Sequence, residues 1–147
     1  MIRLDDYFRT KSVDTIDFLK TDIEGHDYFA LIGLGNYIDK CKFIQFELGI
    51  GAPLRDGFVT NEDYYNLLEK YYDLYIVNDE NNPLWMNGYA TTDLIYIDDL
   101  TKKIISQAQL TGVGFNVFCV NKGMTGDISL LSQSSIGQDI YEKNIFQ

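Results

Sequence analysis

The chain has 147 residues, of which 46% are hydrophobic and 14% aromatic, enough for the core of one globular domain. Twelve basic and 22 acidic side chains give a net charge of −10, which argues against a surface that binds nucleic-acid phosphates or anionic membranes. No apolar run approaches the roughly 20 residues of a membrane span, and the first residues do not form a signal peptide. Cys41 and Cys119 lie in apolar runs without metal-binding spacing, so we expect buried, reduced thiols in a cytoplasmic protein.

The first half of the chain alternates strand and helix patterns. A short amphipathic turn or helix is expected at residues 4–8, and a strand is expected at 16–23. Apolar residues at helical spacing follow at 26–39, and a second strand is expected at 41–48. Strand, helix and strand in this order predict a parallel crossover unit.

The second half continues the alternation. Thr60 and Asp63 resemble the capping box of a helix. Further on, the patterns predict strands at 73–77, 94–97 and 114–120, and a helix at about 101–109. We therefore expect an α/β fold with three layers around a mainly parallel sheet. Residues 1–122 would form the domain, and residues 123–147, rich in Ser, Gln and Gly, a loosely held tail.

Acidic residues gather where the first two strands end. Asp22 ends the first strand, Glu24 follows it and Glu47 ends the second strand, so we expect all three on one rim of the sheet. Such a cluster persists when a cation, a proton or a hydrogen-bonding ligand compensates it, which indicates a metal or polar-ligand site or an acid/base pair. Alternatively, Glu24 or Asp27 merely caps the next helix, and for Asp27 we favour this interpretation.

His26 and Trp85 are the other candidates. A histidine is suited to act as a general base near neutral pH, although His26 is equally well explained as an exposed residue of the first helical turn. Trp85 lies in a loop, where it would stack on a sugar ring or pack into the core. Gly25 permits a tight turn. The Gly-x-Gly pairs at 33/35, 49/51 and 112/114 do not open a helix directly after a strand, so none predicts a dinucleotide loop.

The order of these motifs resembles the C-terminal half of FkbM-type methyltransferases. The likeness covers residues 2–122, and its most specific parts are Leu-Asp-Asp at 4–6, the Asp-x-Glu-Gly-x-acid turn at 22–27 and the glutamate at 47. The family turn ends in glutamate, where this chain has Asp27. The resemblance implies a partial Rossmann-like sheet of the class I methyltransferase type. It also implies S-adenosylmethionine-dependent O-methylation of a hydroxyl on a sugar or natural product.

The resemblance also implies roles for the candidate residues. Asp22, Glu24 and His26 would be catalytic, and Glu47 and Trp85 would bind the acceptor, a small molecule or glycan. The cofactor-binding strands and the glycine-rich loop belong to the N-terminal half of the family domain, so cofactor-binding residues are not assigned, and neither are metal ligands. We expect this chain alone to bind S-adenosylmethionine weakly, which leaves open whether it is an enzyme by itself.

The expected absence of the N-terminal strands has a structural consequence. The strand at 16–23 would be an unpaired edge that associates with a second copy or with a chain that carries the complementary N-terminal half. Two other functions stay open: a non-enzymatic interaction module that pairs through its half-sheet, and a small acidic metal-binding domain.

Overall fold

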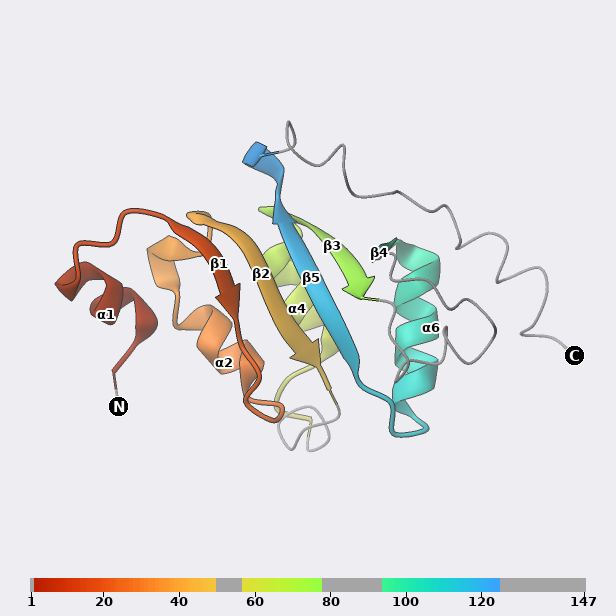
Figure 1. Cartoon of the computed structure of the whole chain (residues 1–147). Coiled ribbons are helices and arrows are strands. Elements are labelled where there is room, and N and C mark those ends of the chain that lie inside the picture. The colour runs from red at the N-terminus through yellow and green to blue at the C-terminus, as the bar shows by residue number, and fades with distance from the viewer. Residues whose placement is uncertain (1, 50–56, 78–93, 125–147) are drawn as a thin grey trace, which may run out of the picture.

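The computed structural model describes residues 2–49, 57–77 and 94–124. These residues form a five-stranded sheet of order β1-β2-β5-β3-β4 (Figure 1). The strands are β1 (Ile16–Lys20), β2 (Cys41–Leu48), β3 (Tyr72–Val77), β4 (Leu94–Tyr96) and β5 (Phe115–Asn121). The helices are α1 (Leu4–Thr10), α2 (Asp27–Ile32), α4 (Asn61–Leu68) and α6 (Asp99–Gln109), with short 3-10 segments η1 (Gly35–Tyr37) and η2 (Lys122–Met124). The α/β class is confirmed.

The sheet is mixed, so the prediction of a mainly parallel sheet is wrong. β1 and β2 are parallel, with Ile16 opposite Cys41, as the strand–helix–strand pattern predicts. The pairs β2–β5, β5–β3 and β3–β4 are antiparallel. β1, β2 and β3 still run in the same direction, because β5 lies between β2 and β3 and is antiparallel to both. The periodicity of a strand does not reveal where in the sheet that strand inserts, which is why the prediction failed.

Helices cover one face of this sheet. Along β2, the buried residues Ile44, Phe46 and Leu48 alternate with partly exposed ones, as expected for a strand with two different faces. α2, α4 and α6 lie against the buried face, where Leu31 and Leu68 are fully buried (Figure 1). The described residues therefore form two layers, not the three that we expect from the sequence.

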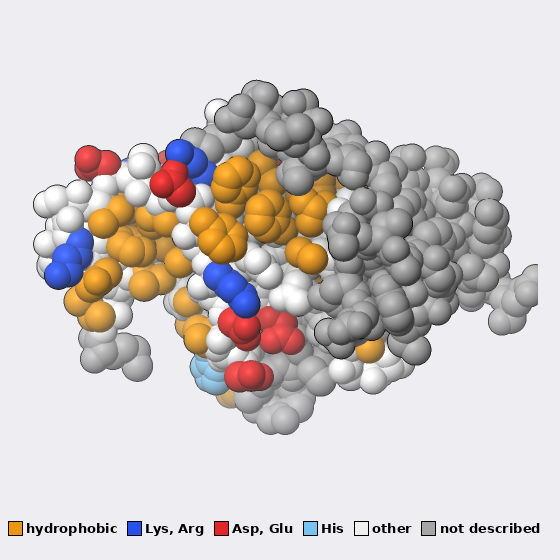
Figure 2. Space-filling view, in the orientation of Figure 1, with side chains coloured by type: hydrophobic (Ala, Val, Ile, Leu, Met, Phe, Trp, Pro, Cys, Tyr) orange, Lys and Arg blue, Asp and Glu red, His pale blue; other side chains and the backbone are white. Residues whose placement is uncertain are grey.

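The other face carries a row of aromatic side chains that crosses the strands. Phe118 stacks on Phe43 with 5.7 Å between ring centroids and lies 6.4 Å from Phe18, while Tyr75 meets Tyr96 edge-on at 5.5 Å. Phe18 belongs to the edge strand and is 51% exposed. Figure 2 shows apolar side chains open to view over this face. Tyr75 is buried, so the exposed part of this row lies at Phe18 and Tyr96, with Phe43 and Phe118 partly exposed. Exposed aromatic side chains grouped in this way are typical of an interaction surface.

The helix predicted over 26–39 is interrupted. α2 ends at Ile32, and Gly35 adopts a left-handed φ of +52°. A Cβ at Gly35 would collide with the carboxylate of Asp5, so the glycine permits α1 to pack closely on this segment. Asp5 N–H donates to the carbonyl of Gly33 at 3.0 Å, which ties α1 to the same turn.

Other sequence predictions are confirmed. Thr60 caps α4 in a capping box, in which the carboxylate of Asp63 accepts from the Thr60 N–H at 2.7 Å. Cys41 and Cys119 are free and fully buried on adjacent strands. Burial raises the pKa of the Cys41 thiol to about 11 and that of Cys119 well above its ordinary value. Among the described helices, none is long and apolar enough to cross a membrane.

Candidate functional site

The turn that follows β1 forms one side of the candidate site. β1 ends at Lys20 rather than at Ile23, and the carbonyl of Ile23 accepts from the N–H of His26 at 3.3 Å. Between them, Glu24 and Gly25 have φ values of +54° and +86°, as in a type I′ turn. A glutamate in the left-handed region costs roughly 1–2 kcal/mol, and strain of this kind concentrates at functional sites.

Glu47 forms the other side of the site. It lies opposite Asn116 of β5, and its carboxylate packs against two glycines. A Cβ on Gly114 would lie 2.8 Å from Glu47 Oε1, and one on Gly49 would lie 3.2 Å from it. Asp22, Glu47 and the segment 112–116 line a cavity of about 390 Å³. The small residues thus leave room for the Glu47 carboxylate at the ends of β2 and β5.

Four carboxylates interact at this end of the sheet, which we call the acidic rim: Asp22, Glu24, Asp27 and Glu47. Burial raises the pKa of Glu47, and the negative charges of the other three raise it further. Lys20 Nζ lies 3.3 Å from Asp22 Oδ2, but both side chains are half exposed, so this ion pair contributes little. The structure therefore brings together the three acids that the sequence places on one rim, and Figure 2 shows acidic side chains at this end of the visible face.

We expect Glu47→Gln to make the protein more stable at neutral pH. A carboxyl whose pKa is raised by folding binds its proton more tightly in the folded state, so the wild-type protein loses stability as the pH rises from the ordinary value of 4.5 through the raised pKa. Thermal unfolding between pH 4 and 8 checks this. The melting temperature of the variant should exceed that of the wild type at pH 7, and the difference should shrink toward pH 4. A difference that is constant with pH would show that the Glu47 carboxyl ionises normally.

Asp27 does not accept the capping hydrogen bond at the start of α2 that we favour on sequence grounds. Its side chain is completely buried at the first position of α2, and neither carboxylate oxygen has a hydrogen-bond partner among the described residues. The hydroxyl of Thr21, which follows β1, is buried and unpartnered in the same way. Asp27 raises the pKa of Glu47 through its negative charge, but it is not among the residues that line the cavity.

The remaining candidates have different surroundings. His26 is exposed at the N-cap of α2, and its ring lies 6.2 Å from that of Phe29, outside the lining of the cavity. Trp85 lies outside the described residues.

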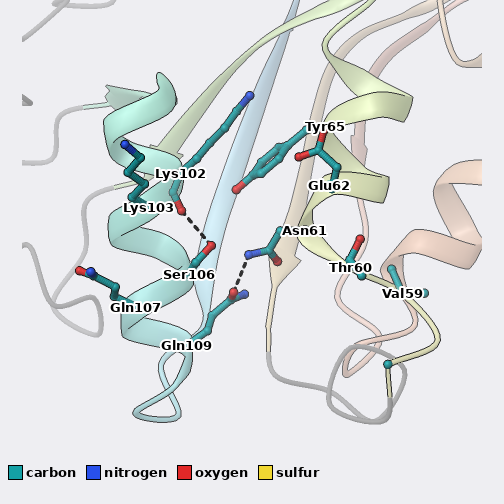
Figure 3. Close-up of a pocket in the computed structure, with 11 residues that line it drawn as sticks. Val59, Thr60, Asn61, Glu62, Tyr65, Lys102, Lys103, Ser106, Gln107 and Gln109 are labelled. Atoms are coloured by element: carbon teal, nitrogen blue, oxygen red, sulfur yellow. Dashed lines mark hydrogen bonds between the residues drawn. The ribbon is translucent and has the colours of Figure 1, made fainter.

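A larger cavity, of about 660 Å³, lies between α4 and α6 (Figure 3). Asn61 donates to Gln109 Oε1 at 2.6 Å, and Gln109 donates in turn to the carbonyl of Leu48 at 3.3 Å. Lys102 lies over the ring of Tyr65 at 4.7 Å and pairs with Glu69 at 2.6 Å. These contacts join the two helices to each other and to β2, so we assign the cavity a structural role. Nothing in the sequence singled out these residues.

One signal in the sequence could have drawn more attention to Asp27. Asp27 belongs to the Asp-x-Glu-Gly-x-acid turn, so the motif itself includes it. Gly49 and Gly114 belong to Gly-x-Gly pairs that the sequence analysis sets aside as cofactor loops, and their close approach to Glu47 is visible only in the structure. Within the described ranges, no group of three or more His, Cys, Asp or Glu side chains is placed to hold a metal ion.

The fold and the site define a class: an α/β domain in which acidic residues follow two adjacent parallel strands. The family model described as the methyltransferase FkbM domain matches residues 1–75, which include β1, α2, β2, α4 and all four acids of the rim. The chain belongs to this methyltransferase family, and the resemblance seen in the sequence is confirmed over these residues. No curated protein and no solved structure is significantly similar to the chain.

Proposed function

We propose that this chain forms the acceptor side of an S-adenosylmethionine-dependent O-methyltransferase with a Rossmann-like sheet, and that its acidic rim binds hydroxyl groups of a small molecule or glycan. The observation that carries the proposal is the cavity lined by Asp22 and Glu47 in a chain of the FkbM methyltransferase family. The proposal concerns binding and positioning of the acceptor in the cytoplasm.

Carboxylates are suited to this task because they accept hydrogen bonds from hydroxyl groups. A hydroxyl must also lose its proton as it takes a methyl group, and a positioned base accelerates that step. In the proposed arrangement Asp22 and Glu24 orient the acceptor. Glu47 takes the proton, because its raised pKa makes it a stronger base than an ordinary carboxylate. His26, exposed beside the turn, would pass that proton to water.

The described residues do not fit the whole cofactor. The residues that line the cavity include no cationic side chain for the carboxylate of S-adenosylmethionine. The glycines at 33, 35, 112 and 114 do not lie between a strand and a following helix, and Gly25, in the turn between β1 and α2, is not part of a Gly-x-Gly pair. We therefore expect no saturable micromolar binding of S-adenosylmethionine to this chain alone in calorimetry, and no step is assigned to the cofactor here.

Saturation-transfer NMR with a panel of sugars and polyols tests acceptor binding directly. We expect hydroxyl-rich ligands to give transfer signals with the wild-type protein. Glu47→Gln and Asp22→Asn should each lower the affinity for these ligands about tenfold. Gly114→Ala should act in the same direction, because its methyl group must displace the Glu47 carboxylate from its position. Glu62→Gln, which removes one exposed acid on α4, is the matched control and should leave binding unchanged. Absence of any transfer, or equal transfer in all variants, would contradict the proposal.

A second candidate function is association through the sheet edge. In the described sheet β1 is an edge strand, and the aromatic row beginning at Phe18 continues from it across the face that the described helices leave uncovered. An open edge with an apolar face is a template for another strand. The partner would be a second copy or a complementary chain of the same family.

We expect Phe18→Lys to abolish association, because a buried apolar side chain of this size contributes about 1.5–3 kcal/mol and the substitution places a charge in its position. Asp22→Asn should leave association intact. Sedimentation of the protein alone, and of the protein with a family member's N-terminal half, measures both effects. A monomer under both conditions, with edge amides as protected from exchange as the rest, would exclude this function.

A further inference from the structure

The sheet face that the described helices leave uncovered is unevenly exposed. At its two margins, Phe18 on β1 and Tyr96 on β4 are each 51% exposed. Between them, Val120 on β5 is 0% exposed and Tyr75 on β3 is 6% exposed. A strip along β5 and β3, which we call the covered strip, is therefore closed to water, although the margins on either side of it are open.

Val120 shows that the covered strip needs atoms above it. This valine is opposite Phe43 of β2 and Asp73 of β3, and opposite residues of neighbouring strands point to the same side of a sheet. Phe43 and Asp73 are themselves partly exposed, so they shield the flanks of the valine and leave the space above it open. The helices α2, α4 and α6 pack on the opposite face (Figure 1). Further atoms must therefore lie over Val120.

The cover is narrow and belongs to the same chain. Neighbouring strands lie about 4.8 Å apart, so a strip over two strands is roughly 10 Å wide, the width of a single helix or extended segment. A partner domain laid over the sheet would bury the margins as well. The structure contains one chain, so a segment of this chain outside the described ranges supplies the cover.

The connections of the sheet indicate which segment this is. Val120 lies near the end of β5, and η2 and then residues 125–147 follow that end. The ranges 50–56 and 78–93 follow β2 and β3 at the other end of these strands, next to the start of β5. Of the longer segments outside the described ranges, only the C-terminal one continues from the end of the sheet at which Val120 lies.

The C-terminal segment has the residues that such a contact requires. Apolar side chains recur along it, at Ile128, Leu130, Leu131, Ile136, Ile140, Ile145 and Phe146. The first group, residues 128–131, comes soon after η2 and is within reach of Val120. Packing this group on the strip removes apolar surface from water on both sides of the contact, which is the main driving force for such an association.

We propose that residues 125–147 pack on the covered strip, with the apolar group at 128–131 over Val120 and Tyr75. This arrangement differs from the loosely held tail that the Ser, Gln and Gly content of the segment suggests. Neither acceptor binding at the acidic rim nor pairing through β1 requires the contact, so it goes beyond the proposed function. The contact leaves Phe18 and the edge of β1 accessible, whereas any chain that covers the whole face must first displace the segment.

A nitroxide label on the segment tests this contact in the full chain. Cys41 and Cys119 are fully buried, so a thiol-specific label added to Ser134→Cys reacts at that position alone. The label broadens the NMR signals of nearby amides, and the effect falls steeply with distance. It therefore reports which face of the sheet the segment lies on.

The amides of Val120 and Tyr75 should lose most of their signal, and that of Leu68 should keep most of its own. Leu68 is the matched comparison, because it ends α4 shortly before β3 starts opposite the end of β5. It thus lies near the same end of the sheet as Val120, but on the face that the helices cover.

Two further variants show whether the apolar group makes the contact. Leu131→Asp places a charge in the group and should abolish the selective loss of signal, because burying an unpaired charge is costly. Ser132→Asp adds the same charge at the next position and should preserve the loss. Equal selective loss in both variants would overturn the proposal. The label on the otherwise unchanged chain decides the question even if Leu131→Asp does not fold.

Two other results would also overturn the proposal. If Val120 and Leu68 lose signal to the same extent, or neither loses any, the segment does not pack on one face of the sheet. The second result concerns a mixture of isotope-labelled chains without nitroxide and nitroxide-bearing chains without isotope. We expect no loss at Val120 in this mixture, and a loss would mean that a second copy supplies the cover.

Discussion

Phe46→Ala is expected to lower the free energy of unfolding by about 3–5 kcal/mol, the usual cost of removing a buried phenylalanine. Phe46 lies on the face of β2 that the helices cover and is 1% exposed. Its ring stacks on that of Tyr64 from α4, with 5.1 Å between the centroids and 5° between the planes. The alanine would leave a cavity between the sheet and α4. Urea unfolding followed by circular dichroism measures the loss.

Phe43→Ala is the matched control for this prediction. Phe43 is the same residue type on the same strand, but it lies on the face that the described helices leave uncovered and is partly exposed. We expect a loss of about 1–2 kcal/mol, since much of its surface already meets water and its main contact is the stack on Phe118. Equal losses for the two variants would mean that another element also covers the face on which Phe43 lies.

Tyr72→Phe is expected to cost about 1–3 kcal/mol, although it removes a single oxygen atom. The hydroxyl of Tyr72 is buried at the start of β3, where it donates to the carbonyl of Ile38 and lies 3.0 Å from that of Cys41. Asn121 also donates to Cys41 at 3.0 Å, so the carbonyl of Ile38 is the group that loses a partner. A buried acceptor left unpaired accounts for the cost.

Tyr71→Phe controls for the loss of a tyrosine hydroxyl as such. Tyr71 precedes Tyr72 and is half-buried, with Lys70 Nζ 4.9 Å above its ring. We expect a change within about 0.5 kcal/mol for this variant, as for most surface substitutions. Chemical denaturation of both variants gives the comparison. A loss for Tyr72→Phe no larger than that for Tyr71→Phe would show that water replaces the lost hydrogen bond without cost.

Local sequence patterns predicted the elements better than their assembly. The alternation along β2 and the capping box at Thr60 are recorded in neighbouring residues, so both were predicted correctly. The antiparallel pairing of most strands was not predicted, because nothing in the sequence of β5 indicates that it inserts between β2 and β3. The interruption of the helix at Gly35 depends on the packing of Asp5, which is remote in sequence.

The candidate site shows the same limit. The crossover rule places Asp22 and Glu47 at neighbouring strand ends, and the structure lines one cavity with both. The burial of Asp27 without a hydrogen-bond partner could not be predicted, because a carboxylate at the first turn of a helix usually accepts a hydrogen bond there. Its burial and its unpartnered oxygens depend on how the turn with Glu24 and Gly25 positions α2 against the sheet.

The two buried thiols give this protein an internal reporter of sheet opening. Cys41, at the start of β2, and Cys119, in the central strand β5, are fully buried, and burial disfavours the reactive thiolate of each. An alkylating reagent therefore modifies them only when the packing around β2 and β5 opens. The rate of alkylation, followed by mass spectrometry, measures that opening without an added label. A ligand that binds at the acidic rim should slow it, because Glu47 and Asn116 are opposite each other on the same two strands.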